Sequence, residues 1–357
     1  MIFLILIVII VFAFLSVDIV ILFSEWQSRI HIGRWNDRKQ WQEAIEKRAR
    51  IWLGRTPTVR MTGQNRLILL DIFRGEFRNT TIQKWQTAGL ILGLSEDCVK
   101  EYVKSHDDLF IQGDVTPEDF LLAYSLKKHG CLSEGQEKAI LSSCQSIRNE
   151  GTMCYRPWVK DIRFVDTLGM VLPLLHSCGW DDLAIRQLQE YDAVLLKGIY
   201  PAHAYHLEKK LPLGVYDWSR GIGWYILALI ETADMSDCKA RIIILAEAML
   251  NHQNLDGGFS CFVFNSRERM ESSGTVLVGL LFLSAYRLSG DKRFFIAALN
   301  VEKALMKSTR RNGALDNCQG DTYGIGYYSR VFSIMPFAQG LALRFSKELD
   351  KYINENA

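Results

Sequence analysis

The chain has 357 residues, of which 48% are hydrophobic and 23% are charged, a composition typical of a globular protein with one sizeable core. Its formal net charge of +2 comes without clusters of lysine and arginine, which excludes the usual electrostatic footprint of a nucleic-acid-binding protein. The eight cysteines stand singly and lack the Cys or His spacing of a zinc site, so we expect buried free thiols and no bound metal.

The first predicted element is an apolar N-terminal helix. The stretch from Ile2 to Phe23 is interrupted only by Ser16 and Asp18, and a helix of this length can cross a bilayer. A signal peptide would begin with basic residues and end with small residues at a cleavage site, and neither feature is present. We therefore expect an uncleaved single-span membrane anchor over residues 1–24.

The residues after this span carry more positive than negative charge. The basic residues closest to it are Arg29, Arg34, Arg38 and Lys39. Positive charge favours the cytoplasmic side of a membrane, and cysteines without a disulfide pattern favour a reducing compartment. We expect the rest of the chain to face the cytoplasm, with a periplasmic or extracellular location as the alternative.

Beyond the anchor, apolar residues recur at helical spacing, and glycine-rich loops near Gly151, Gly257 and Gly313 separate the helices. The interval between the loops is about fifty residues, which suits a helix–loop–helix repeat and leaves room for about six repeats. Periodicity alone does not distinguish a closed toroid from an open solenoid. Because no linker rich in Pro, Ser or Gly follows the anchor, residues 25–357 are predicted to form one domain.

The most informative motif is residues 217–225, DWSRGIGWY. The guanidinium of Arg220 is a planar, permanently charged fork that fits a carboxylate. The indoles of Trp218 and Trp224 can stack on the apolar face of a sugar ring, and the glycines allow close approach of the backbone. These residues predict a site for an anionic sugar, although a helix start with both indoles in the core is the structural alternative.

Four further segments lie around this motif: residues 164–170 (FVDTLGM), 201–205 (PAHAY), 270–275 (MESSGT) and 313–328, which begins with GAL and ends with GIGYY. Together the five segments resemble the unsaturated glucuronyl and rhamnogalacturonyl hydrolases of glycoside hydrolase families 88 and 105, more closely family 105. The resemblance covers roughly residues 65–345. Two positions depart from the family pattern, because Ile222 replaces the usual Asn and Asp321 follows Gly320 where Gly-Thr is common.

The resemblance implies an all-α fold, an (α/α)6 barrel of six helical hairpins after the N-terminal transmembrane helix. It also implies a hydrolase that hydrates the 4,5 double bond of an unsaturated uronic acid at the non-reducing end of lyase-generated oligosaccharides, without any cofactor. One alternative is a carbohydrate-binding or surface-polysaccharide protein on the same fold. Another is a different α/α-toroid enzyme, such as a saturated-glycan hydrolase or an epimerase, which would need a second acid close to Asp166.

The resemblance assigns catalysis to Asp166, the proton-handling residue, and to Asp114 as a second acid. Asp166 is surrounded in sequence by apolar residues, so we expect burial to raise its pKa towards neutrality; from its position alone it could instead cap a helix. Asp107 and Asp108 compete with Asp114, which could also be a helix cap before Pro117.

The resemblance assigns substrate binding to His203, Trp218, Arg220 and Trp224. Arg220 is expected to pair with the uronate carboxylate, and the two tryptophans to stack on the ring. His203 is expected to hydrogen-bond sugar hydroxyls or water, with His206 as the nearby alternative. Glu271 is expected to cap the following helix rather than to react.

Overall fold

The computed structural model describes residues 1–57, 59–61, 66–79, 83–106, 109, 115–143, 148–149, 151–235 and 237–355. Asp107, Asp108 and Asp114, three of the predicted acidic candidates, lie outside these residues. The helices are α1 (Ile2–Arg29), α2 (Arg38–Gly54), α3 (Ile68–Phe73), α4 (Lys84–Gly93), α5 (Glu96–Lys104), α6 (Pro117–Lys128), α7 (Glu134–Ser142), η2 (Pro157–Val159), α8 (Val165–Ser177), α9 (Asp181–Leu195), α10 (Ser219–Glu231), α11 (Cys238–Leu250), α12 (Ser272–Ser289), α13 (Lys292–Lys307) and α14 (Pro336–Glu355).

Short strands connect the helices. They are β1 (Val59–Arg60), β2 (Arg78–Asn79), β3 (Arg148–Asn149), β4 (Thr152–Met153), β5 (Ile162–Phe164), β6 (Leu196–Lys197), β7 (Tyr200–Pro201), β8 (Ala204–His206), β9 (Leu211–Leu213), β10 (Cys318–Gln319) and β11 (Phe332–Ser333). Strands of two or three residues are too short to show the period-two alternation by which a strand is recognised in a sequence.

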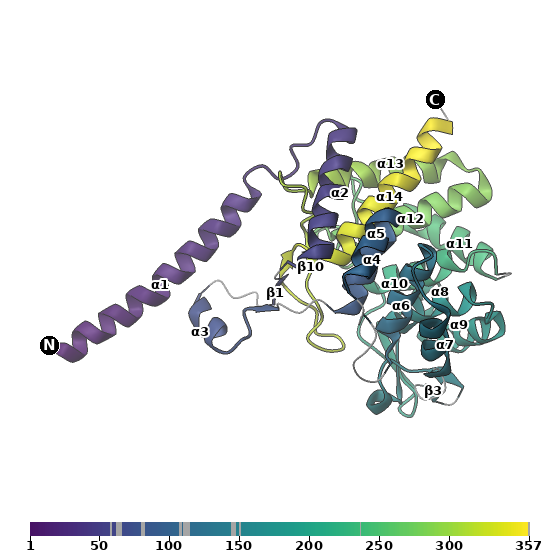
Figure 1. The fold of residues 1–357 in the computed structure, drawn as a ribbon, viewed down its shortest axis with the longest axis horizontal. Helices are drawn as coiled ribbons and strands as arrows, with labels where there is room; N and C mark the ends of the chain where they lie inside the picture. The colour runs from purple at the N-terminus through teal and green to yellow at the C-terminus, as the bar shows by residue number, and fades with distance from the viewer. Residues whose placement is uncertain are drawn as a thin grey trace.

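Helices α4, α6, α8, α10, α12 and α14 form a closed inner ring within the described part of the chain. Each of them contacts the next, and α14 returns to contact α4. Helices α2, α5, α7, α9, α11 and α13 alternate with them along the chain and pack on the outside (Figure 1). Because the last inner helix meets the first, the repeats close into a toroid, and the predicted (α/α)6 barrel is confirmed.

The sequences of the two layers account for their places. In the inner helix α12, every residue from Ser272 to Leu283 is buried, because small and apolar side chains cover all of its faces. The outer helix α13 has one apolar stripe, which includes Phe294, Val301 and Leu305, and its opposite face is polar. The six outer helices therefore shield the ring from water, and the inner ones build the core.

Helix α1 points away from the barrel (Figure 1), and most of its side chains are exposed. By length and composition it could cross a membrane. Its last turn is attached to the barrel, since Arg29 pairs with Asp316 at 2.7 Å and donates to the carbonyl oxygen of Phe332 at 2.7 Å. The apolar part of α1 thus continues into a helical turn that is fixed on the folded domain.

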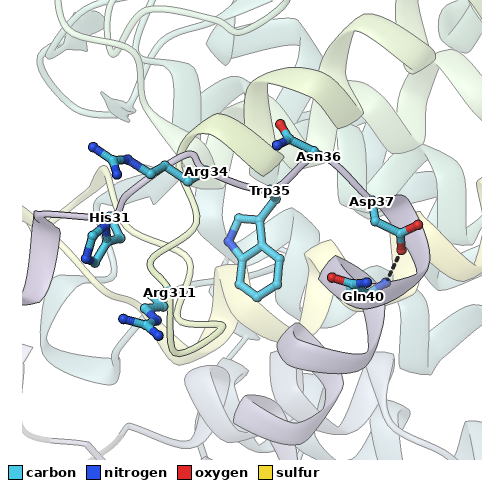
Figure 2. Close-up of a pocket in the computed structure, with 7 residues that line it drawn as sticks. All are labelled: His31, Arg34, Trp35, Asn36, Asp37, Gln40 and Arg311. Carbon is cyan, nitrogen blue, oxygen red and sulfur yellow. Dashed lines mark hydrogen bonds between the residues drawn. The ribbon is translucent and has the colours of Figure 1, made fainter.

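Residues 30–37 connect α1 to α2, and the indole of Trp35 projects from this segment (Figure 2). The Trp35 Nε1 donates to the carbonyl oxygens of Thr309 and Arg310, and Asp37 caps α2 by accepting from the backbone N–H of Gln40. A hollow of about 600 Å³ lies here, wide open to solvent and bordered by His31, Arg34 and Arg311. Among the described residues that border it, Asp37 is the one carboxylate, and it is engaged as the cap of α2.

The expectation of buried free thiols is met only in part where the structure describes the cysteines, since Cys98, Cys131 and Cys178 are half-buried and the other described ones are buried. Cys98, Cys131, Cys154, Cys178, Cys238, Cys261 and Cys318 are free thiols, and Cys144 lies outside the described residues. Among the described residues no group of His, Cys, Asp and Glu is arranged to hold a metal ion.

Candidate active site

A cavity of about 130 Å³ lies where the N-terminal ends of inner helices α4, α8 and α10 meet the loop between β10 and β11. It is lined by Gln83, Trp85, Tyr155, Asp166, Met170, Trp218, Arg220, Trp224, Asp321 and Thr322. Four of the site residues predicted from the sequence therefore line the same cavity: Asp166, Trp218, Arg220 and Trp224.

Asp166 stands in the first turn of α8, directly after strand β5. This strand pairs with β8 in the register Phe164↔Ala204, and the backbone N–H of Val165 donates to the carbonyl oxygen of His203 at 3.0 Å. The small sheet therefore brings His203 beside Asp166, although the two are far apart in the sequence.

The carboxyl group of Asp166 has a raised pKa of about 6. Burial is the main cause, and the neighbouring carboxylate of Asp321 adds to it, while a backbone hydrogen bond and the charge of Arg220 oppose it. Among the described residues, the buried Oδ2 has no hydrogen-bond partner. A carboxyl group with this pKa can donate a proton and take one back near neutral pH.

His203 is buried, and its Nε2 lies 3.9 Å from Oδ2 of Asp166. Burial, together with the charge of Arg220, lowers the pKa of His203 to about 4, so the imidazole is neutral at neutral pH and the two groups are not an ion pair. A separation of 3.9 Å is too long for a direct hydrogen bond. A water or a hydroxyl group between the two could hydrogen-bond to both.

Arg220 is buried in the first turn of α10, with its guanidinium 5.2 Å from the ring of Trp218. Its Nη1 donates to the carbonyl oxygen of Gln319, and its Nη2 donates to that of Gly320 at 2.7 Å. The sequence analysis expected this fork to face a substrate carboxylate. In the structure it holds the backbone just before Asp321, while its positive charge still borders the cavity.

The two tryptophans belong partly to the core and partly to the cavity. Trp218 donates from Nε1 to Oε1 of Gln319 at 3.0 Å, and its ring lies 5.2 Å from that of Tyr328. Trp224 packs against Trp85 and Phe337, with ring centroids 5.7 and 4.8 Å away. Both rings are almost completely buried and both residues line the cavity, so core packing is observed and sugar stacking stays a prediction.

Asp321 is a cavity residue that the sequence analysis noted only as a departure from the family pattern. Its side chain reaches solvent at the cavity mouth. Burial within the surrounding walls raises its pKa, and Arg220 opposes the shift. The replacement of the usual Gly-Thr by Gly320-Asp321 was therefore the feature of the sequence from which a second acid in the cavity could have been predicted.

Tyr155, Gln83 and Trp85 also line the cavity and carried no signal in the sequence. The Tyr155 hydroxyl donates to Oε1 of Glu118 at 3.1 Å, and Glu118 is also paired with Arg156. Gln83 and Trp85 lie at the start of α4 and Tyr155 precedes β5, so tertiary packing brings them to the same cavity.

Glu271 is completely buried and acts as a helix cap, as expected. Its Oε1 accepts from the backbone N–H groups of Ser273 and Gln319 at 3.0 Å each, and its Oε2 accepts from that of Gly274 at 2.6 Å. The carboxylate thereby joins the start of α12 to strand β10, which precedes the cavity loop.

No family model matches the chain, and no curated protein matches its sequence. Solved structures match its fold. A possible member of the GH105 family from Klebsiella pneumoniae has a TM-score of 0.68 at 16% identity, over 89% of this chain and 95% of that one. The unsaturated glucuronyl hydrolase of Bacillus sp. GL1 has a TM-score of 0.63 at 14% identity, over 88% and 97%. An unsaturated glucuronyl hydrolase specific for heparin has a TM-score of 0.66 at 14% identity, over 88% and 98%.

These likenesses show that the chain has the six-hairpin barrel fold of those structures over nearly its whole length. The structural neighbours belong to the two groups of hydrolases that the sequence motifs resemble. At 14–16% identity they establish the architecture, and the activity has to be argued from the site.

Proposed function

We propose that this protein hydrates the 4,5 double bond of an unsaturated uronic acid at the non-reducing end of an oligosaccharide and thereby releases that sugar. The observation that carries the proposal is the state of Asp166: its pKa is about 6, and its buried Oδ2 has no hydrogen-bond partner among the described residues. The residue lies in the wall of a cavity lined by tryptophans and a buried arginine.

In this reaction Asp166 donates its proton to C4, and positive charge develops at C5 and the ring oxygen. Water adds to C5 and gives a proton to the Asp166 carboxylate, so the residue returns to its starting state. The resulting hemiketal opens and the glycosidic bond breaks without further help. The net change is the addition of one water, and one carboxyl group of intermediate pKa serves both proton transfers.

The neighbours of Asp166 suit this chemistry. Neutral His203, 3.9 Å away, can accept a hydrogen bond from water and hold it against the carboxylate. The positive charge of Arg220 favours binding of a uronate near the cavity, and the tryptophan edges offer apolar surface to the flat unsaturated ring. Asp114, the second proposed catalytic acid, lies outside the described residues.

The test is incubation of the full-length protein in detergent with unsaturated oligosaccharides made by polysaccharide lyases. Turnover removes the conjugated double bond, so its ultraviolet absorbance should fall. A matched incubation with the saturated oligosaccharides should release no sugar. If absorbance stays constant while the oligosaccharide binds, as measured by calorimetry, the carbohydrate-binding alternative replaces the hydrolase.

A second candidate function is favoured by Asp321. Two carboxyl groups in one cavity are the equipment of an ordinary glycoside hydrolase, in which one acts as acid and the other as base or nucleophile. Here Asp166 and Asp321 both line the cavity and each has a raised pKa. Release of sugar from the saturated oligosaccharides, abolished by Asp321→Asn, would favour this function over hydration.

We further infer that α1 is an uncleaved membrane anchor and that the barrel faces the cytoplasm. The contacts of α1 support its retention: Asp18 accepts hydrogen bonds from the backbone N–H groups of Leu67 and Ile68, both at 2.9 Å, and Arg29 pairs with buried Asp316. Removal of residues 1–24 would take away Asp18, which accepts from the backbone N–H groups of Leu67 and Ile68 in the structure. The basic residues after the span support the cytoplasmic orientation.

A further inference from the structure

Between β1 and β2, residues 66–77 lie away from the barrel, and their helix α3 contacts α1 (Figure 1). This excursion, which we name the α3 hairpin, is described at residues 66–77. The carboxylate of Asp18 accepts hydrogen bonds from the backbone N–H groups of Leu67 and Ile68, both at 2.9 Å. One turn further along α1, Ile21 borders an apolar hollow together with Ile72 and Phe77.

These contacts lie near the C-terminal end of the apolar run of α1, and this position indicates where the hairpin would lie in a membrane. The apolar run of α1 extends from Ile2 to Phe23, and a run of this length matches the hydrocarbon core of a bilayer, about 30 Å thick. Asp18 and Ile21 belong to the last turns of that run. If α1 crosses a bilayer, the α3 hairpin lies at the boundary between the acyl chains and the headgroups.

The surface of the α3 hairpin has the chemistry of that boundary. Its exposed apolar side chains are Leu67, Leu70, Ile72 and Phe73, with Phe73 76% exposed, and none of them is covered by the barrel. Arg66 and Arg74, both exposed, flank this apolar stretch. An apolar face between cations is typical of a segment that lies in a membrane interface, where arginine reaches lipid phosphates.

Asp18 gives an independent argument. A carboxylate near the end of a membrane span is costly unless its oxygens are hydrogen-bonded. Here both oxygens accept from the start of α3, and the side chain is buried although most of α1 is exposed. The hairpin therefore supplies hydrogen-bond donors to the one acidic group of the apolar run, as an acid near the end of a membrane span requires.

We propose that the α3 hairpin inserts into the interface of a phospholipid bilayer beside α1 and forms a second membrane contact of this protein. This contact is linked to the loop that lines the candidate active-site cavity. Strand β1, which precedes the hairpin, is followed by Met61, whose carbonyl oxygen accepts from the hydroxyl of Tyr323, two residues after Asp321. The membrane contact thus holds the loop that forms the cavity mouth at a set height above the lipid.

The experiment places a photo-crosslinking benzoylphenylalanine at one position of the full-length chain, reconstituted in vesicles of phosphatidylcholine and phosphatidylglycerol. The test position is Phe73. Phe12, an exposed residue of α1, reports whether α1 is in the lipid, and Ile244, an exposed residue of α11 on the side of the barrel away from α1 (Figure 1), is the aqueous control. Each protein must keep the melting temperature of the parent in detergent.

We expect lipid adducts from Phe73 and Phe12 and at least about tenfold fewer from Ile244. Adducts from Phe12 without adducts from Phe73 would overturn the proposal and leave the anchor in place. Absence of adducts from both would overturn it as well, because the depth of the hairpin is measured against α1. None of these results depends on catalysis, so the proposed hydrolase activity stands or falls separately.

Discussion

At the scale of single residues, the chemistry proposed for this protein depends on the surroundings of Asp166. Its burial disfavours the charged form, and the nearby Asp321 reinforces this effect, whereas Arg220 limits it. The three groups together hold the pKa of Asp166 at about 6, where a small change in any neighbour alters the protonated fraction at neutral pH. Three predictions belong to this scale.

Asp166→Asn should lower kcat for hydration by about a thousandfold or more, since general acid–base catalysis supplies factors of this order and the amide cannot donate an acidic proton. KM should change little. Steady-state rates on lyase-generated oligosaccharides measure both constants. Retention of more than about a tenth of the parental kcat would move the catalytic role to another acid, with Asp114 and Asp321 as the first candidates.

The pH dependence of kcat/KM should show the titration of Asp166. Proton donation requires its protonated form, which predominates below pH 6 and declines about tenfold per pH unit above it, so the rate should be level at low pH and fall as pH rises through about 6. Asp321→Asn removes a charge that raises the Asp166 pKa and should move the falling limb to lower pH. Glu208→Gln, at an exposed carboxylate outside the cavity, is the control and should leave the profile in place.

Arg220→Lys should raise KM and lower the melting temperature together. An ammonium group cannot make the two directed contacts to the carbonyl oxygens of Gln319 and Gly320, and hydrogen bonds from a charged group contribute about 1.5–3 kcal/mol each. Substrate kinetics and thermal unfolding in detergent test the two effects. A lower melting temperature with an unchanged KM would show that Arg220 only positions the loop and does not contribute to substrate binding.

At the scale of helices, the ring closes where α4 meets α14. A Cβ atom at Gly340 would lie 2.0 Å from the carbonyl oxygen of Gly89, and one at Gly93 would lie 2.0 Å from that of Gly340. The two helices can approach this closely only because these positions have no side chain. This contact between α4 and α14, which we call the seam, joins the last repeat to the first. It therefore decides whether the repeats form a closed toroid or remain open.

Gly340→Ala should therefore lower the free energy of unfolding by about 3 kcal/mol or more, at the upper end of the usual cost of overpacking. The matched control is Gly135→Ala in the outer helix α7, where an added Cβ meets no atom within 4 Å; it should be neutral or stabilising by up to about 1 kcal/mol. Thermal unfolding of both variants in detergent measures the difference. Equal melting temperatures would mean that the seam can open without loss of stability.

At the scale of the whole molecule, the barrel should lie on the cytoplasmic side of the membrane, because basic residues such as Arg29 and Arg34 follow the span. A reporter that is active only after export and one that fluoresces only in the cytoplasm, each fused after the C-terminal helix α14, provide the measurement. Cytoplasmic fluorescence without exported activity is expected. The opposite pattern would overturn the orientation while leaving the roles of Asp166 and Arg220 unaffected.

The sequence was sufficient for the features that depend on local pattern. Helical periodicity and loop spacing indicated about six hairpins, and the motif resemblance decided for a closed barrel, which the ring of inner helices confirms. The same motifs led to Asp166, Trp218, Arg220 and Trp224, which line one cavity. A long apolar run suffices to identify a helix that could cross a membrane, because bilayer thickness sets its length.

Other features exist only through contacts between distant residues, and the tertiary structure alone decided them. The pairing of β5 with β8 brings His203 close to Asp166. The loop between β10 and β11 places Asp321 in the cavity wall as a second acid. The hydrogen bonds of Arg220 to Gln319 and Gly320, about 100 residues away, could not be read from its motif, which specifies a charge but not its partner. Local sequence determines which helices form and where they are apolar. The close packing of those helices determines which charged groups lose water, and therefore which of them acquire the pKa and the free hydrogen-bonding positions that chemistry requires.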